Sequence, residues 1–216
     1  MRTHQERLAI FQSSDIYPVV SSEFCCGRDV VDIVSAIGSA GAKIVQIREK
    51  NISDAAMFEL VKRCRQITDQ HNMLLIVDDR LDIAMAAGAD GVHLGQDDFP
   101  LAEAKKLAPG MFFGVSTHDA SEIRKALADG CSYLNIGPMF PTNTKSVACG
   151  ALGLELIEEL KQLVSCPFSV MGGIKEHHLE MLHSKGFRHI AMVTEITQAP
   201  DVEAKVRQLR KIMNGC

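Results

Sequence analysis

Apolar and polar side chains alternate in the stretch Ile44-Val45-Gln46-Ile47-Arg48-Glu49-Lys50. Successive residues of a strand point to opposite faces, so Gln46, Arg48 and Lys50 share one face if this stretch is extended. Two neighbouring cations repel each other unless an anion lies between them, and a phosphate or pyrophosphate suits the donors of Arg and Lys. The stretch therefore indicates either a phosphate-binding strand end or a solvated strand edge.

Short β-rich runs like this one recur along the chain, with helical patterns between them. The strand candidates are Ile16–Val20, Ile44–Ile47, Leu74–Val77, Gly91–Leu94, Phe112–Val115, Tyr133–Ile136, Phe168–Met171 and Ile190–Val193. The stretches between them, among them Asp54–His71, Ser121–Asp129 and Leu154–Leu163, have the apolar spacing of helices and few Gly or Pro. Residues that cap helices fit the same boundaries: Gly41, Gly88, Gly130 and Gly186 at helix ends, and Ser53 and Asp119 at helix starts.

This alternation of strands and helices predicts an α/β protein with a single (β/α)8 fold, the TIM barrel. We expect one domain that spans residues 1–216, with a short helical N-terminal extension of about a dozen residues. An open doubly wound sheet is the alternative, but no Gly-rich dinucleotide motif follows the first strand.

The amino-acid composition of the chain limits the classes of binding partner that we expect. The chain of 216 residues has 46% hydrophobic residues and a net charge of −4, which argues against a general nucleic-acid binder. No apolar run of about 18 residues occurs, so we expect no membrane-spanning helix. The seven cysteines include no C-x-x-C pair, which indicates reduced thiols and a cytoplasmic location rather than a zinc or thioredoxin-type site. Small-molecule substrates are the expected partners, and the sequence leaves open whether the chain forms a homo-oligomer.

Polar residues gather at the predicted strand ends, which meet on one rim of a (β/α)8 barrel. These groups are Arg48 and Lys50, then Asp78-Asp79-Arg80, His93 to Asp98, Ser116-Thr117-His118, Gly137 to Lys145, Gly172-Gly173, and Thr194. Asp79 and Asp98 follow neighbouring strands, and two converging carboxylates can share Mg²⁺ together with phosphate oxygens. The alternative for each aspartate taken alone is a helix N-cap.

Two further segments are suited to a phosphate. The stretch Gly137-Pro138-Met139-Phe140-Pro141-Thr142-Asn143-Thr144-Lys145 is rigid at its start, then rich in hydroxyls, then cationic. Gly172-Gly173 allows the backbone to approach a phosphate at a strand-to-helix turn. An ordinary polar loop is the alternative for the first segment. His93, on a strand bounded by apolar residues, is interpreted as a hydrogen-bonded core histidine rather than an acid or base, and His177-His178 as solvated.

Taken in order, these motifs resemble thiamine phosphate synthases over roughly residues 14–205. The matching segments are Gln46-Ile47-Arg48-Glu49-Lys50, Asp79-Arg80, Gly91 to Asp98, Gly114-Val115-Ser116, Gly137-Pro138 with Thr142 to Lys145, and Gly172-Gly173-Ile174. The resemblance implies a (β/α)8 enzyme that joins hydroxymethylpyrimidine diphosphate to thiazole phosphate and releases pyrophosphate. It also implies a dissociative reaction, in which pyrophosphate departs before the thiazole nitrogen captures the pyrimidine-methyl cation.

The resemblance also implies a role for each matching residue. The pyrimidine diphosphate would be held by Gln46, Arg48, Lys50, Ser116 and Lys145. Neighbouring positions would also belong to the substrate-binding residues: Ile47, Glu49, Asp78 and Asn143. Arg48, Lys50, Ser116 and Lys145 would be catalytic. Magnesium would be bound by Asp79 and Asp98, and the thiazole phosphate by Thr142, Thr144, Gly173, Val193 and Thr194.

Three features depart from the family pattern. Asp78 stands where the family usually has Asn, Glu195 stands where it has a small residue, and residues 146–151 lack the usual proline. A carboxylate at position 78 would repel a pyrophosphate unless it were protonated or turned toward the metal. Two other functions remain as alternatives: a thiazole tautomerase of a related branch, which lacks the aspartate pair, and a non-catalytic barrel that binds thiamine precursors.

Overall fold

The computed structural model describes residues 2–142 and 150–215, in which eight parallel strands form a closed barrel in the order β1 to β8. The strands are β1 (Ile16–Val20), β2 (Ile44–Ile47), β3 (Leu74–Asp78), β4 (Gly91–Leu94), β5 (Phe112–Thr117), β6 (Tyr133–Ile136), β7 (Phe168–Val170) and β8 (Ile190–Met192). β1 pairs with β8 through Ile16 and Ile190, so the sheet has no free edge. The predicted (β/α)8 fold is confirmed, and the open doubly wound sheet is excluded.

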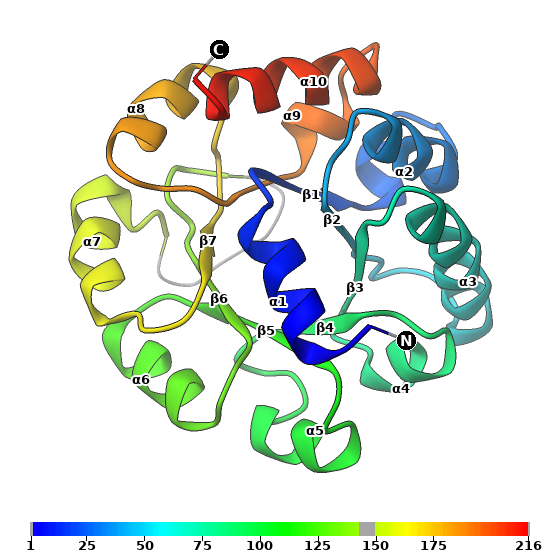
Figure 1. Cartoon of the computed structure of the whole chain (residues 1–216), viewed down its shortest axis with the longest axis horizontal. Coiled ribbons are helices and arrows are strands. Elements are labelled where there is room, and N and C mark those ends of the chain that lie inside the picture. The colour runs from blue at the N-terminus through cyan, green and yellow to red at the C-terminus, as the bar shows by residue number, and fades with distance from the viewer. Residues whose placement is uncertain (1, 143–149, 216) are drawn as a thin grey trace.

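Helices surround the barrel, as Figure 1 shows. They are α2 (Val30–Ser39), α3 (Asp54–Gln70), α4 (Leu81–Ala86), α5 (Leu101–Leu107), α6 (Ala120–Ala128), α7 (Gly153–Leu160), α8 (Leu179–Ser184), α9 (Thr194–Thr197) and α10 (Val202–Met213), with 3₁₀ turns at Ser22–Phe24, Lys161–Leu163 and Glu176–His178. The larger hydrophobic cluster lies between the strands and these helices, and includes Val45, Val77 and Phe113. Strands covered in this way are buried on both faces, which explains their nearly continuous apolar runs.

The N-terminal helix α1 (His4–Gln12) precedes the first strand and closes one end of the barrel. It begins with a capping box between Thr3 and Glu6. Phe11 on this helix is fully buried, with its ring centroid 4.6 Å from that of Tyr133 inside the barrel. Figure 1 shows α1 crossing the end of the barrel that faces the viewer. Functional groups at the strand carboxyl ends therefore lie on the opposite face.

Some predicted strand bounds were wrong by one or two residues. β3 extends to Asp78 because this residue pairs with His93 of β4, and β5 extends to Thr117 because it pairs with Ile136 of β6. β7 ends at Val170 and β8 at Met192, each one residue before the predicted end. The two longer strands carry polar residues at their ends, which alternation of apolar residues does not reveal.

The predicted helix caps are confirmed. Ser53 accepts a hydrogen bond from the backbone of Ala56, and Asp119 accepts from those of Ser121 and Glu122. The four glycines predicted at helix ends have φ between +69° and +84°, in the left-handed region that suits glycine: Gly41, Gly88, Gly130 and Gly186.

Two expectations from composition can be compared with the described residues. None of the helices in the described ranges combines the length and the apolar character that crossing a bilayer requires. The described cysteines are free thiols: Cys25, Cys26, Cys64, Cys131 and Cys166.

Candidate functional site

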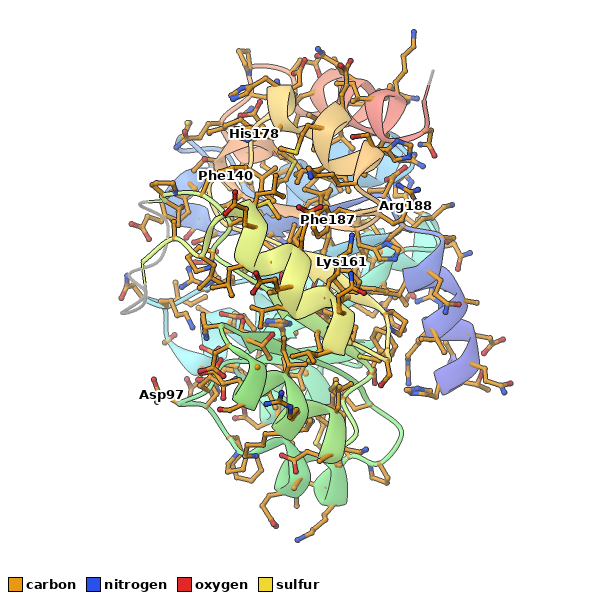
Figure 2. All side chains as sticks on the ribbon, turned by 90° about the vertical axis from the view of Figure 1, so that its left-hand side faces the viewer. Asp97, Phe140, Lys161, His178, Phe187 and Arg188 are labelled. Carbon is orange, nitrogen blue, oxygen red and sulfur yellow. The ribbon has the colours of Figure 1, made fainter. Side chains whose placement is uncertain are left out.

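Polar side chains from different strands meet on the barrel face opposite α1. Figure 2 shows Asp97 and Phe140 on this side, with α1 at the other side of the molecule. Asp97 follows β4 and Phe140 follows β6, so loops distant in sequence contribute to the same face. The loops after β4 and β6 thus lie on the face where the sequence analysis expects the rim.

Arg48 and Lys50 contact the same carboxylate. Nε of Arg48 lies 3.3 Å from Oδ2 of Asp78, and Nζ of Lys50 lies 3.0 Å from the same oxygen. Asp78 is the last residue of β3 and is 8% exposed. Burial, together with the neighbouring Asp79 carboxylate, raises the pKa of Asp78 to about 6 against the opposing effect of the two cations. The anion expected between the two cations is thus, in this structure, a side chain of the protein itself.

Asp79 occupies a special backbone position. Its φ of +59° lies in the left-handed region, which Asp tolerates better than most residues, and its N–H donates to the carbonyl oxygen of His93. Its carboxylate accepts a hydrogen bond from Lys50 and shares one with Asp98. Burial alone would raise the pKa of Asp79, but these hydrogen bonds keep it below its usual value. The turn therefore aims the carboxylate at both Lys50 and Asp98.

Asp98 completes the predicted carboxylate pair. Its Oδ2 atom accepts a hydrogen bond of 2.6 Å from the backbone N–H of Gly95. Burial, followed by the hydrogen bond with Asp79, raises the pKa of Asp98. Two carboxylates that face each other attract a proton or a divalent cation between them.

The donor set suits magnesium better than zinc. Mg²⁺ is commonly held by one or two carboxylates together with phosphate oxygens and water, and Asp79 and Asp98 supply the two carboxylates. Among the described residues, no cluster of three or more His, Cys, Asp or Glu side chains could hold a metal by itself. Phosphate oxygens would therefore have to complete the coordination.

Arg80 does not join this group. Its guanidinium contacts Asp54 and lies 2.7 Å from Asp82, so it ties the start of α4 to the start of α3. This Arg matches the family motif, but its charge is directed away from the carboxylate pair.

A chain of hydrogen bonds crosses the barrel interior beneath the rim. It runs from Gln46 Nε2 to Tyr17 OH over 2.9 Å and from Tyr17 OH to Tyr133 OH over 2.8 Å. It continues from Tyr133 OH to His93 Nδ1 over 3.0 Å and ends with His93 Nε2 and Ser116 Oγ at 2.9 Å. All five residues are buried. His93 is thus a hydrogen-bonded core histidine, as predicted.

Tyr17 and Tyr133 are members of this chain of hydrogen bonds that the sequence pattern does not reveal. Both residues lie within strands whose sequences are mostly apolar. That their hydroxyls form hydrogen bonds becomes evident only when the facing strands and their polar residues are placed. Burial raises the pKa of both hydroxyls, so they remain neutral donors and acceptors. Their presence links Gln46 to Ser116 across the barrel.

A cavity of about 500 Å³ opens on the same face, over β5 to β8. Its walls include predicted binding residues from four separate loops or strands: Ser116, Thr142, Gly173, Val193 and Thr194. This volume is in the range of pockets for small molecules. The structure thus brings together the described residues that the sequence assigned to thiazole phosphate.

A network of ion pairs, not predicted from the sequence, borders this cavity. Glu195, which follows Thr194, lies 3.4 Å from Lys175 and 3.1 Å from Lys205. Lys205 also contacts Glu176 at 2.7 Å. Burial opposes ionisation of Glu195, but the two lysines together hold its pKa below the usual value. The unusual Glu195 is therefore compensated by cations.

Packing between loops, as well as the predicted phosphate binding, explains why two glycines follow β7. Gly172 has a φ of +96° and Gly173 a φ of +63°. A side chain on Gly172 would collide with Pro138, and one on Gly173 would collide with the carbonyl oxygens of Phe140 and Pro141. The backbone N–H of Phe140 donates to Gly172 O at 2.9 Å, so these glycines let the loops after β6 and β7 pack together.

Several predicted residues lie elsewhere or outside the described ranges. Ile47 packs between the barrel and the helices, and Glu49 binds the backbone N–H and hydroxyl of Ser22 at 2.6 and 2.7 Å. The predictions for Asn143, Thr144 and Lys145 concern positions outside the described residues.

The expectation that both His177 and His178 are solvated is wrong for His178. This side chain is half-buried and stacks on Phe140, with ring centroids 4.0 Å apart and an interplanar angle of 21°. Figure 2 shows the two rings from the loops after β6 and β7 lying close together. The sequence could not reveal this contact because the two residues are far apart along the chain.

Comparisons with known proteins agree on one family. The family described as thiamine monophosphate synthase matches residues 16–196. A thiamine-phosphate synthase of Pelotomaculum thermopropionicum is 40% identical over 202 residues, which cover 93% of each chain. A thiamine-phosphate synthase of Caldicellulosiruptor saccharolyticus is 37% identical over 210 residues, which cover 97% of this chain and 95% of the relative.

Two solved structures illustrate the likeness in three dimensions. A thiamine phosphate pyrophosphorylase from Pyrococcus furiosus superposes with a TM-score of 0.88 at 31% identity, covering 95% of this chain and 98% of that one. A 3-hexulose-6-phosphate synthase superposes with a TM-score of 0.66 at 17% identity, over 92% of this chain and 99% of that one. The second likeness concerns the fold alone.

Proposed function

Because the chain belongs to the thiamine monophosphate synthase family, we propose roles for its residues in the synthesis of thiamine phosphate. The enzyme joins hydroxymethylpyrimidine diphosphate to thiazole phosphate and releases pyrophosphate. The names of the relatives establish this transfer reaction.

The diphosphate is bound at the ends of β2, β3 and β5. Arg48 and Lys50 contact its phosphate oxygens, since a guanidinium and an ammonium offer complementary donors. Gln46 and Ser116 hold the pyrimidine from the two ends of the buried hydrogen-bond chain. Lys145 is assigned to the diphosphate, and Asn143, two residues earlier, to the substrate, in both cases through the family motif.

The thiazole phosphate occupies the cavity over β5 to β8. Thr142 and Thr194 offer hydroxyl groups there, and Gly173 and Val193 offer backbone. Thr144 is included through the family motif. Placing the two ligands on neighbouring parts of one rim brings the thiazole nitrogen to the carbon from which pyrophosphate departs.

Asp79 and Asp98 would hold Mg²⁺. When bound, the ion supplies positive charge to the oxygens of the leaving pyrophosphate. Asp79 reaches this position through its left-handed turn, and Asp98 through its hydrogen bond to Gly95. In this structure Lys50 contacts Asp79. When another cation pairs with that carboxylate, the ammonium of Lys50 can contact a phosphate oxygen instead.

The chain's own cations favour a dissociative course. Arg48 and Lys50 stabilise the charge that develops on the leaving group, and such stabilisation is commonly the largest part of catalysis. Ser116 contacts His93, but the other ring nitrogen of His93 faces Tyr133 and not a carboxylate, so the described site residues hold no complete Ser, His and Asp set. The pyrimidine-methyl cation is then captured by the thiazole nitrogen.

The observation that carries the proposal is the convergence of Arg48 and Lys50 on one carboxylate beside the aspartate pair. The test is calorimetry of the Lys50→Ala variant with each substrate in turn. We expect weaker binding of the diphosphate by about tenfold or more, and little change for the thiazole phosphate. Lys62→Ala, on the exposed face of α3, is the matched control. Equal losses for the two ligands would contradict the assignment.

The remaining parts of the proposal concern the whole chain. Residues 1–216 form one barrel domain with a short N-terminal extension, which acts in the cytoplasm on small molecules. Neither nucleic acid nor membrane is a partner, and a homo-oligomer is compatible with this function. The aspartate pair argues against the tautomerase alternative and against a non-catalytic binding protein.

A further inference from the structure

Asp78 holds both cations of the proposed diphosphate site. Its Oδ2 atom lies 3.3 Å from Arg48 Nε and 3.0 Å from Lys50 Nζ. An Asn side chain at this position would have nearly the same shape but could offer the two cations only a neutral carbonyl oxygen. The carboxylate therefore adds a competing anion where the substrate's phosphates are to bind.

The charges around the site do not favour a further anion. Two cations, Arg48 and Lys50, face three carboxylates, those of Asp78, Asp79 and Asp98. When all three carboxylates are ionised, this described group carries one net negative charge. A diphosphate brings several more negative charges to the same place.

We propose that Asp78 makes binding of the diphosphate conditional on a divalent cation. Without the cation, the diphosphate must displace Asp78 from Arg48 and Lys50 and leave that carboxylate buried beside it. With the cation, positive charge beside Asp79 and Asp98 offsets the third carboxylate. This inference rests on the proposed function, because it takes Arg48 and Lys50 as the ligands of the diphosphate.

The mechanism is a coupling between two ligands of one site. Each ligand increases the affinity for the other by the same factor. Asp78 increases that factor because, once the anion takes Arg48 and Lys50, this buried carboxylate has no counter-charge unless the metal supplies one. An enzyme with Asp78 thereby disfavours metal-free pyrophosphate and related anions that lack magnesium. Asp78 is a specificity-determining residue for the metal-loaded substrate.

The test is a calorimetric comparison with inorganic pyrophosphate as the probe, in chelator and in excess Mg²⁺. It uses the wild-type protein and Asp78→Asn in a buffer of about pH 8, where carboxylates are ionised. The measured quantity is the factor by which Mg²⁺ tightens binding. We expect this factor to be larger in the wild type by about tenfold or more, because Asp78→Asn binds metal-free pyrophosphate more tightly.

Two further variants make the result specific. Asp69→Asn removes one negative charge from the exposed end of α3, away from the rim, and should behave as the wild type. Asp78→Ser also removes the charge and should reproduce Asp78→Asn if the Asn variant folds poorly. Unfolding curves of all variants establish that each is folded at the temperature of the titration.

Each outcome has a distinct meaning. If Mg²⁺ tightens binding by the same factor in wild type and Asp78→Asn, the inference about Asp78 is wrong while the proposed site stands. If neither protein binds pyrophosphate with Mg²⁺ present, the assignment of Arg48 and Lys50 fails, and the inference fails with it. A larger factor in the wild type, with Asp69→Asn unchanged, supports both.

Discussion

Nε2 of His93 lies 2.9 Å from Oγ of Ser116, and this contact ends a buried chain of hydrogen bonds that starts at Gln46. The chain passes through the hydroxyls of Tyr17 and Tyr133, which lie 2.8 Å apart. Gln46 and Ser116, on opposite parts of the barrel, are therefore oriented by the same set of buried groups. Their positions are set by the barrel interior rather than by the ligand.

Tyr17→Phe should disturb this chain without changing the shape of the core. The change removes the acceptor of Gln46 and a partner of Tyr133, and leaving buried polar groups unpaired costs about 1 to 3 kcal/mol. Urea unfolding measures this loss, and steady-state kinetics should show a raised KM for the diphosphate because Gln46 loses its anchor. In a double-mutant cycle with Tyr133→Phe, the double variant should lose less stability than the sum of the losses in the two single variants. Full additivity would show that the two hydroxyls act separately.

Asp98→Ala tests the carboxylate pair. We expect the rate of pyrophosphate release to fall by about a hundredfold or more, because leaving-group charge is no longer stabilised through this side chain. Asp97→Ala is the matched control, since Asp97 is the exposed neighbour and points outward in Figure 2. Circular dichroism should show both variants folded. Full activity of Asp98→Ala in the presence of a chelator would show that Asp98 is not a ligand of the metal.

Asp90 holds the end of the barrel that α1 covers. Its carboxylate contacts Arg2 at 2.9 Å and Arg65 at 2.5 Å, and accepts a hydrogen bond of 3.0 Å from the backbone of Leu75. Asp90→Asn should lower the free energy of unfolding by about 3 kcal/mol, because two partly buried arginines lose their counter-ion. Asp82→Asn, an exposed aspartate on α4, should change it little.

The stability difference between the wild type and Asp90→Asn should also depend on pH, and the direction follows from the pKa of Asp90. Burial opposes ionisation of Asp90, but the hydrogen bond and charge of Arg65 outweigh it, with help from Leu75 and Arg2, so the pKa of Asp90 is lowered. A lowered pKa contributes stability above the pKa of the unfolded chain, about 3.9, and that contribution is lost as the pH falls through the lower value of the folded state. The stability difference between wild type and Asp90→Asn should therefore be constant near neutral pH and shrink in acid. A difference that grew below about pH 4 would contradict this account.

Cys131 and Cys166 should form a disulfide under mild oxidation. Their Sγ atoms lie 3.8 Å apart, two residues before the neighbouring strands β6 and β7, and both side chains are partly exposed. Diamide takes up the two thiol hydrogens while the sulfur–sulfur bond forms, so a peptide map should contain one linked pair that reductant separates. Cys166→Ser should abolish the link, whereas Cys64→Ser, which removes a buried thiol, should not. A map in which Cys131 stays a free thiol after oxidation would contradict the prediction.

Some parts of the fold followed from local patterns. The apolar runs of the eight strands and the caps at Ser53 and Asp119 depend on contacts within a few residues, so they could be predicted. The rim could be predicted too, because parallel strands that alternate with helices bring all their carboxyl ends to one face. The matching of Gln46, Arg48, Lys50, Asp79 and Asp98 to a family rested on these local segments.

The tertiary structure decided which groups face one another. That Asp78 lies against Arg48 and Lys50 follows from the pairing of β2 with β3 and from the length of β3, and neither can be read from the spacing of residues. The same holds for Tyr17 and Tyr133, for His178 on Phe140, and for Glu195 between Lys175 and Lys205. The sequence by itself determined the barrel, its rim and the kinds of side chain on it, because these depend on local periodicity. The partners of each charge and hydroxyl depend on contacts between distant segments, and only the closed barrel brings those segments together.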